Sequence, residues 1–413
     1  MSTSTSSDVI WTSNFIKLTL AHLCGAMGYA SMLLLPLYLH TIGGSRSEIG
    51  FIMALASITG LITRPLVGWS LDEIGRKASL TFGCILTVIA MLLIYWVEEI
   101  DWVIYLSRTL FGLGEGFLFT GYFAYATDLL PARRRTEGLA LFGVAGLVPL
   151  LVNPIANLTG YQGESLGNFI VYVAGLVSLS IILILWIKHP TSIDHPSQED
   201  QSHTQEPPHE MSPPDHSSIN TPPSSRWHIF LSAPLRPLWF ASFIFAGSVA
   251  LFMTFISVVA ENRAMEMPTM SWFTYVAGAV GARLFGAKLP EKVGPHRLVQ
   301  PALLSYALAL GITSVAYHST WFLCAGLFAG LAHGYCFPVL TSLIVSAVPQ
   351  AIRGSALAVF TGLWGFSAVV FTPLGGWIAD QWSDQSMFIT MSICVTLSAL
   401  YLHPKRFMVA NQS

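Results

Sequence analysis

Arg108 and Glu115 stand seven positions apart in residues 102–128, a long and mostly apolar run. Seven residues are nearly two turns of an α-helix, so the two side chains share one face, about 10 Å apart along the axis. Burial raises the pKa of a carboxyl group, and a nearby guanidinium lowers it. We therefore expect Glu115 to carry a proton, with Arg108 setting its proton affinity or holding an anionic substrate.

A histidine occupies the matching position of a later apolar run, because His333 follows Glu115 by 218 residues. Histidine titrates near neutral pH without any perturbation, so His333 is the second candidate for proton transfer. The alternative is that these buried groups form static, hydrogen-bonded polar contacts that only specify packing. Three other polar side chains of apolar runs are expected to line a cavity wall: Tyr29, Tyr122 and Asn153.

The composition of the chain indicates the elements that hold these residues. Of its 413 residues 53% are hydrophobic and 10% are charged, and the mean hydropathy is +0.60. About a quarter of the residues of a soluble domain are charged, whereas a protein in lipid needs an apolar exterior. The net charge of −2 gives no basic surface for nucleic acid. The five cysteines lie in apolar runs without a C-x-x-C spacing, so we expect them to be small apolar side chains.

Twelve runs approach the length of about 20 apolar residues that a transmembrane helix needs. They lie at 17–40, 48–71, 78–97, 102–128, 137–159, 167–188, 237–260, 270–288, 298–317, 320–346, 354–379 and 386–403. The first run is too long for the core of a signal peptide and no cleavage site follows it, so it should remain a helix. The sequence predicts an all-α integral membrane protein with twelve transmembrane helices.

The basic residues predict the orientation, because cytoplasmic loops carry an excess of Lys and Arg. With both termini inside, all 20 Lys and Arg residues except Arg46, Arg108 and Arg263 fall on or beside the cytoplasmic face. The outer connections carry mainly acidic residues. We expect a multi-pass protein of the cell inner membrane with both termini in the cytoplasm, and a monomer.

The chain divides into an N-terminal six-helix half (1–188), a flexible cytoplasmic linker (189–236) and a C-terminal six-helix half (237–413). The linker is rich in Pro, Ser, His and acidic residues and has no apolar periodicity. Its five histidines lack the tight spacing of metal ligands, so no metal site is expected.

The two halves are related by a repeat of 218 residues, which predicts pseudo-symmetry. Matched pairs include Gly112 with Gly330, Pro131 with Pro349, and Arg135 with Arg353. A parallel repeat of six helices is typical of transporters whose binding site lies near the membrane midplane between the halves.

A charged loop between the second and third runs allows a more specific interpretation. Its sequence "GWSLDEIGRK" fits the pattern G-x-x-x-D-x-x-G-R-[KR] through Gly68, Asp72, Gly75, Arg76 and Lys77. This loop resembles the signature loop of the major facilitator superfamily. The stretch "RTLFGLGEG" is similar to the second motif of that superfamily. Because helix number, repeat and linker also agree, the chain is identified as a member, with the twelve-helix fold in two six-helix halves.

The resemblance implies a cytoplasmic gate. In the superfamily the aspartate of the loop meets the N-terminus of helix eleven, where the helix dipole favours an anion. Its arginine pairs with an acid at the inner end of helix four. The matching residues here are Asp72, Arg76 and Asp128. The alternative is that Arg76 and Lys77 serve only as topology signals.

The second half provides an internal comparison for this gate. Its loop, residues 286–297, has Pro290 at the position of Asp72, and Ser346 stands at the position of Asp128. Both acids are replaced together, so we expect a single gate of this kind.

The expected function follows from the family and from these local patterns. "PLYL", "SRSEIG" and "TRPLVGW" resemble bacterial efflux permeases for sugars, drugs and metallophores, whereas R-x-x-x-G-x-x-E-G is similar to organic-anion transporters. We expect a secondary transporter that exports a small organic molecule in exchange for protons. The alternatives are a proton-coupled symporter of an organic anion and, from another class, a receptor or scaffold that transports nothing.

Enzyme activity is not expected, because no nucleophile with a base and no cluster of metal ligands is present in the sequence. No cofactor is expected either, since the proton gradient would supply the energy. The expected partners are a small-molecule substrate, protons and the lipid bilayer.

Overall fold

The computed structural model describes residues 9–131, 134–161, 165–188, 235–286, 289–349 and 352–402. Helices of the first half are α1 (Ser13–Ser31), η2 (Met32–Leu34), α2 (Leu35–Thr41), α3 (Arg46–Ile62), α4 (Arg64–Glu73), α5 (Arg76–Ile94), α6 (Trp102–Leu129), α7 (Arg135–Ala145), η4 (Val148–Leu151), α8 (Val152–Leu158) and α9 (Leu166–Leu185). Helices of the second half are α11 (Leu235–Asn262), α12 (Ser271–Leu284), α13 (Leu289–Val293), α14 (Pro295–Val315), α15 (Ser319–Ser346), α16 (Arg353–Gln381) and α17 (Asp384–Tyr401).

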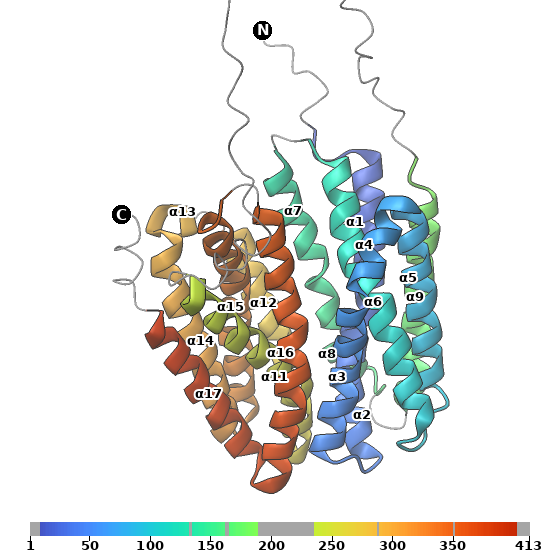
Figure 1. Cartoon of the computed structure of the whole chain (residues 1–413). Coiled ribbons are helices and arrows are strands. Elements are labelled where there is room, and N and C mark those ends of the chain that lie inside the picture. Colours follow the sequence, from blue (N-terminus) through green and yellow to red (C-terminus); the bar gives the residue numbers. More distant parts are fainter. Residues whose placement is uncertain are drawn as a thin grey trace, which may run out of the picture.

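The helices form two bundles that stand side by side (Figure 1). Eight continuous or joined helices of the described residues are long and apolar enough to cross a membrane, and the bent pair α3–α4 makes nine. The helices α6, α12 and α17 run alongside them (Figure 1). All twelve predicted runs coincide with helices, and their bounds agree within four residues. The predicted all-α membrane fold is therefore confirmed.

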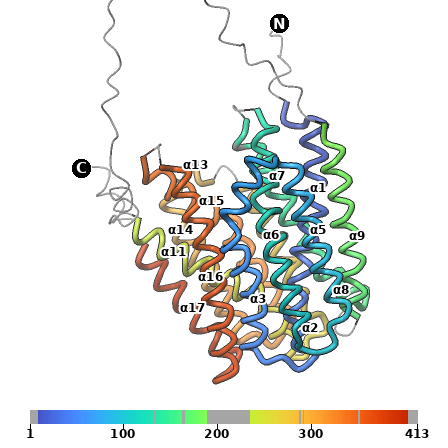
Figure 2. Tube along the Cα trace, turned by 45° about the vertical axis from the view of Figure 1, so that its right-hand side comes forward, coloured from blue at the N-terminus to red at the C-terminus, as the bar shows by residue number. Residues whose placement is uncertain are grey.

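The contact between the bundles is made chiefly by α3 and α16, which lie side by side in both views (Figures 1 and 2). The helix α1 begins and α17 ends at one face of the molecule, at the top in Figure 1. We call this face the terminal face and the other the opposite face. The predicted linker, residues 189–236, lies outside the described residues except for its last two.

Prolines bend two of the membrane helices, because a proline cannot donate the backbone hydrogen bond of a regular helix. The second span bends by 47° between α3 and α4, where Pro65 opens the new helix. The fifth span changes from α7 through the short helix η4 to α8, with Pro149 in η4 and Pro154 in α8. The first of these bends places Arg64 at the junction.

Matched glycines of the repeat do the same structural work in both halves. The backbone at Gly75 has φ +102° just before α5, and Gly294 has φ +92° just before α14. Positive φ values of this size favour glycine. A side chain at Gly112 would overlap the backbone of Ala56, and one at Gly330 would overlap that of Tyr275. The repeat in the sequence thus reflects the same turn and the same close helix contact in each half.

Candidate functional site

A cavity of about 320 Å³ lies between the two halves. Helices α1, α3, α4 and α6 form its wall on one side, and α11, α15 and α16 form it on the other. Its wall is mostly apolar, with aromatic side chains at Phe111, Phe119, Phe337 and Trp364. We call this space the central cavity.

Arg108 lies in the wall of the central cavity and is only 3% exposed. Its Nε and Nη2 donate to the backbone carbonyls of Ile52 and Met53 on α3, each over a long distance of 3.4 Å. Its guanidinium lies over the ring of Phe111, 5.0 Å from the centroid. Its Nη1 has no hydrogen-bond partner in the described residues. One buried donor of a charged group is thus left unsatisfied next to the cavity, which is costly unless a ligand meets it.

Glu115 lines the same cavity, two turns further along α6. The four ion pairs of the described residues do not include it. No hydrogen bond to its carboxylate is present in this part of the chain. An acid at membrane depth normally has a functional role, and this one can gain or lose a proton without breaking a protein contact.

Arg64 is a third charged residue of the cavity wall. Its Nη2 donates to the carbonyl of Thr361 at 2.6 Å, and its Nη1 donates to the Thr361 hydroxyl at 3.1 Å. These bonds connect α4 of the first half with α16 of the second. The sequence analysis placed Arg64 with the basic residues on or beside the cytoplasmic face. The structure differs because the bend before Pro65 leaves Arg64 at the level of the cavity. The Arg-Pro pair inside an apolar run was the available signal.

The other predicted candidates take different positions. Tyr29 lines the cavity, and its hydroxyl is 3.7 Å from the sulfur of Met253 across the two halves. His333 is separated from the cavity by Trp364, on which its ring stacks at 5.8 Å. Its Nδ1 forms a hydrogen bond with the hydroxyl of Tyr275. The structure therefore does not bring Glu115 and His333 together in one wall.

Tyr122 and Asn153 do not belong to the lining of this cavity, in contrast to the expectation. Tyr122 is buried inside the first half, where its hydroxyl donates to the carbonyl of Ala21 at 3.0 Å. Asn153 is buried in α8, and its Nδ2 donates to the carbonyl of Leu150 at 3.1 Å. Pro154 cannot donate to that carbonyl, so the Asn153 side chain replaces the missing helical bond.

The predicted gate residues form a cluster at the terminal face. Arg76 donates from Nε to Asp128 at 3.0 Å and from Nη1 to Asp72 at 2.9 Å. The cluster joins α4, α5 and α6, all within the first half. The side chain of Asp72 is 73% exposed and accepts no hydrogen bond from the described part of α16. The contact with helix eleven that the resemblance implies is not present in this conformation.

The remaining residues of the loop have structural roles that the structure makes clear. The Nζ of Lys77 donates to the carbonyl of Leu185 at 3.4 Å and also to that of Ile187, at the end of α9. Cations at the end of a helix satisfy its last carbonyls and oppose its dipole. Gly68 faces open space, as does Gly354 near the start of α16.

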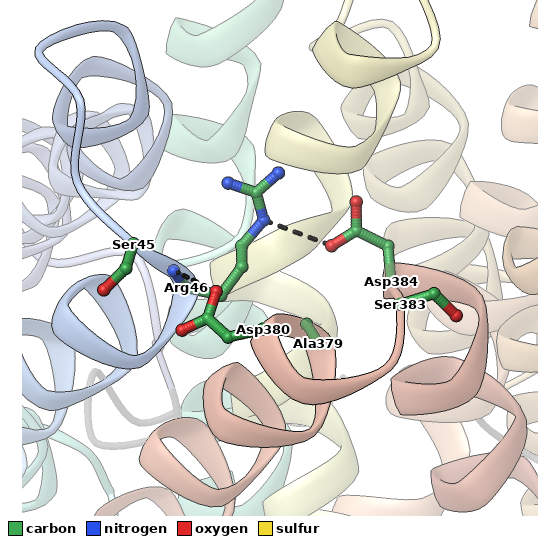
Figure 3. Close-up of a pocket in the computed structure, with 6 residues that line it drawn as sticks. All are labelled: Ser45, Arg46, Ala379, Asp380, Ser383 and Asp384. Atoms are coloured by element: carbon green, nitrogen blue, oxygen red, sulfur yellow. Dashed lines mark hydrogen bonds and ion pairs between the residues drawn. The ribbon is translucent and has the colours of Figure 1, made fainter.

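At the opposite face the two halves are joined by a charged network (Figure 3). Asp380, near the end of α16, accepts from the backbone amide of Arg46 at 2.9 Å and from that of Ser47 at 2.7 Å. The Nε of Arg46 donates to Asp384 at 3.1 Å (Figure 3). A carboxylate from one half thus caps the N-terminus of α3 in the other half, where it also opposes the helix dipole.

Two more polar side chains extend this opposite-face network. His40 shares hydrogen bonds with Arg46 Nη1 at 2.8 Å and with Asn262 at 2.7 Å. Asn262 also donates to Asp384 at 2.8 Å. The sequence analysis interpreted Asp380 and Asp384 only as acidic residues of outer connections, because their partners lie more than 300 residues away in the chain.

The exposure of α16 shows on which side the central cavity is closed. Arg353, Gly354 and Ser355 at its start are exposed, whereas Thr372 and Gly376 near its end are buried. Side chains at Gly50 or Gly376 would overlap the backbone of the facing helix, so α3 and α16 touch backbone to backbone near the opposite face. The two halves meet at the opposite face and separate towards the terminal face.

Two pseudo-symmetric helical bundles, with charged residues in a cavity between them, define a membrane transporter built for alternating access. The chain belongs to the Major Facilitator Superfamily, whose family description matches residues 18–312 and 238–409. Multidrug resistance protein 2 of Bacillus subtilis is 23% identical over 75% of this chain and 74% of its own length. An uncharacterized MFS-type transporter of Salmonella typhimurium is 21% identical over 90% of this chain and 91% of its own.

Solved structures show the same fold. The crystal structure of the nucleoside transporter NupG superposes with a TM-score of 0.74 and covers 94% of this chain and 99% of its own. Its sequence is 12% identical, so the likeness concerns the fold. The protein is accordingly a multi-pass secondary transporter of this superfamily.

Proposed function

We propose that this protein couples the transport of a small organic molecule to proton movement, with Glu115 as the proton carrier. The observation that carries the proposal is the carboxylate of Glu115, which lines the central cavity without an ion pair or hydrogen bond in the described residues. Its side chain can therefore exchange protons with the cavity in each conformation. Alternating access then moves the loaded or empty carboxyl group from one side to the other.

The orientation is part of the proposal. Basic residues gather at the terminal face, among them Lys17, Arg134, Lys188, Arg236 and Arg353. The opposite face carries acidic residues such as Glu98, Asp101, Glu261 and Glu266. By the positive-inside rule the terminal face lies in the cytoplasm of a bacterial cell, with the protein in the inner membrane. The structure then represents the state that is open to the cytoplasm.

The mode of coupling depends on the charge of the cargo. A cation that binds next to ionised Glu115 displaces the proton, which gives exchange and export. This mode is supported by the name of the multidrug resistance relative. An anion in the cavity favours the protonated, neutral form of Glu115, which gives movement of both in the same direction.

Proton movement in proteoliposomes tests the proposal. Vesicles that contain a pH-sensitive dye are given a gradient of a transported probe, either ethidium or 2-naphthoate, and the internal pH is followed. We expect a pH change with the wild-type protein and with Glu261→Gln, a control at an exposed acid of the opposite face. The Glu115→Gln variant should lose this change yet still exchange probe for probe. Probe transport without proton movement in the wild type would contradict the proposal.

A further inference from the structure

We infer that the cargo of the central cavity is an organic anion with an aromatic or aliphatic body, anchored through Arg108. This inference rests on the proposed role of the cavity as the transport site. It names the class of substrate and, with it, the mode of coupling.

The charge of the cavity wall is the first argument. Among the described residues that line it, Arg64, Arg108 and Glu115 are the ionisable ones that carry charge at neutral pH. Arginine keeps its charge in proteins, so the wall is positive whether or not Glu115 holds a proton. A low-dielectric cavity lined by an excess of one sign concentrates the opposite charge within it.

The unsatisfied donor of Arg108 is the second argument. Its guanidinium is almost fully buried, is held by two long bonds to backbone carbonyls, and keeps Nη1 without a partner in the described residues. A carboxylate or sulfonate can accept charge-assisted hydrogen bonds from such a guanidinium. A cation would leave the donor unsatisfied and add repulsion. Arg64 differs, because its guanidinium already donates to Thr361.

The apolar part of the wall describes the rest of the cargo. The ring of Phe111 lies against the Arg108 guanidinium, and the ring of Trp364 lies in the wall contributed by the other half. A volume of about 320 Å³ is at the lower end of small-molecule pockets, about 300–1,000 Å³. It suits a carboxylate on one or two fused rings better than a peptide or a glycoside.

Proton coupling follows from the same charges. An anion at Arg108 lies in the same cavity as Glu115 and is repelled by its ionised form. Binding of the anion therefore favours protonated Glu115, and protonation raises the affinity for the anion by the same factor. The cavity thus favours transport of proton and anion together.

Three probes of matched shape test the inference: 2-naphthoate, 2-naphthylmethylammonium and the neutral 2-naphthylmethanol. Their binding to the full-length protein in nanodiscs is measured by equilibrium dialysis. We expect the anion to bind at least about tenfold more tightly than the other two, as a charge-assisted hydrogen bond permits. Its affinity should rise as the pH is lowered from 8 to 6, while Glu115→Gln should keep the high affinity at both pH values.

Variants of Arg108 complete the test. Arg108→Gln should lower the affinity for 2-naphthoate about tenfold or more, and Arg108→Lys should retain part of it. Arg353→Gln, at an exposed arginine of the terminal face, should bind like the wild type. The inference is overturned if the cation binds as tightly as the anion, or if folded Arg108→Gln binds 2-naphthoate normally.

The probe comparison on wild-type protein stays decisive if the Arg108 variants do not fold. The outcome is also separable from the proposed function. Selective, Arg108-dependent binding without proton movement in vesicles would support the anion and refute proton coupling. Proton movement driven by ethidium, with no preference for 2-naphthoate, would do the reverse.

Discussion

The carboxylate of Asp380 accepts a hydrogen bond from the backbone amide of Arg46 at 2.9 Å, across the boundary between the two halves. Asp380 lies near the end of helix eleven, and Arg46 is the first residue of helix two. The gate implied by the signature loop has the reverse arrangement, in which Asp72 near the end of helix two approaches the start of helix eleven. Each side of the transporter thus has an aspartate suited to cap the opposing helix, and the structure shows the Asp380 contact formed.

Removal of the Asp380 cap should release the opposite face. We expect Asp380→Ala to weaken closure by about 1 kcal/mol, the typical value of a helix cap. The population open to the outside would then rise about fivefold. A cysteine at Ser57, in the cavity wall, reports this as faster labelling by an impermeant maleimide added outside. Parent protein without the added cysteine gives the background.

A matched control for this variant is Asp101→Ala. Asp101 also caps a helix, because it accepts from the amide of Val103 at 3.0 Å, but both residues belong to the first half. Its loss should reduce stability without changing labelling at Ser57. Equal labelling rates for the two variants would show that the Asp380 cap does not hold the opposite face closed.

The Asp72 side chain should act only in the conformation that is closed to the cytoplasm. We expect Asp72→Asn to shift the equilibrium towards the open conformation seen here, because an interaction with the dipole of helix eleven is lost. Such interactions contribute about 0.3–1 kcal/mol, so labelling at Ser57 from the cytoplasmic side should rise about two- to fivefold. Glu73→Gln, at the exposed neighbour, is the control. Unchanged accessibility in Asp72→Asn would refute the gating role.

Asn153 should be important for stability and not for transport. Its side chain supplies the donor that Pro154 lacks, so Asn153→Ala leaves the Leu150 carbonyl unsatisfied in the membrane. We expect a loss of about 1 kcal/mol in the free energy of unfolding, seen as a lower melting temperature. Adding Pro154→Ala restores a backbone donor and should recover the stability. A double variant as unstable as Asn153→Ala would contradict this explanation.

Local patterns in the sequence were sufficient for the twelve spans, because a helix in lipid needs a long apolar run wherever it lies in the fold. They also identified Glu115 and Arg108, since a charge within such a run is conspicuous. They could not place Arg64, whose position depends on the bend before Pro65. Asp380 was missed as a contact for a different reason, because its partners belong to the other half and meet it only in the folded protein.

The central claim, that Glu115 gains and loses a proton, can be measured directly by infrared difference spectroscopy of the protein in lipid. The carbonyl stretch of a protonated carboxyl group should appear as the pH is lowered, and it should be absent from Glu115→Gln. Glu261→Gln should keep the band. A wild-type spectrum without such a pH-dependent band, or the same band in Glu115→Gln, would contradict the account.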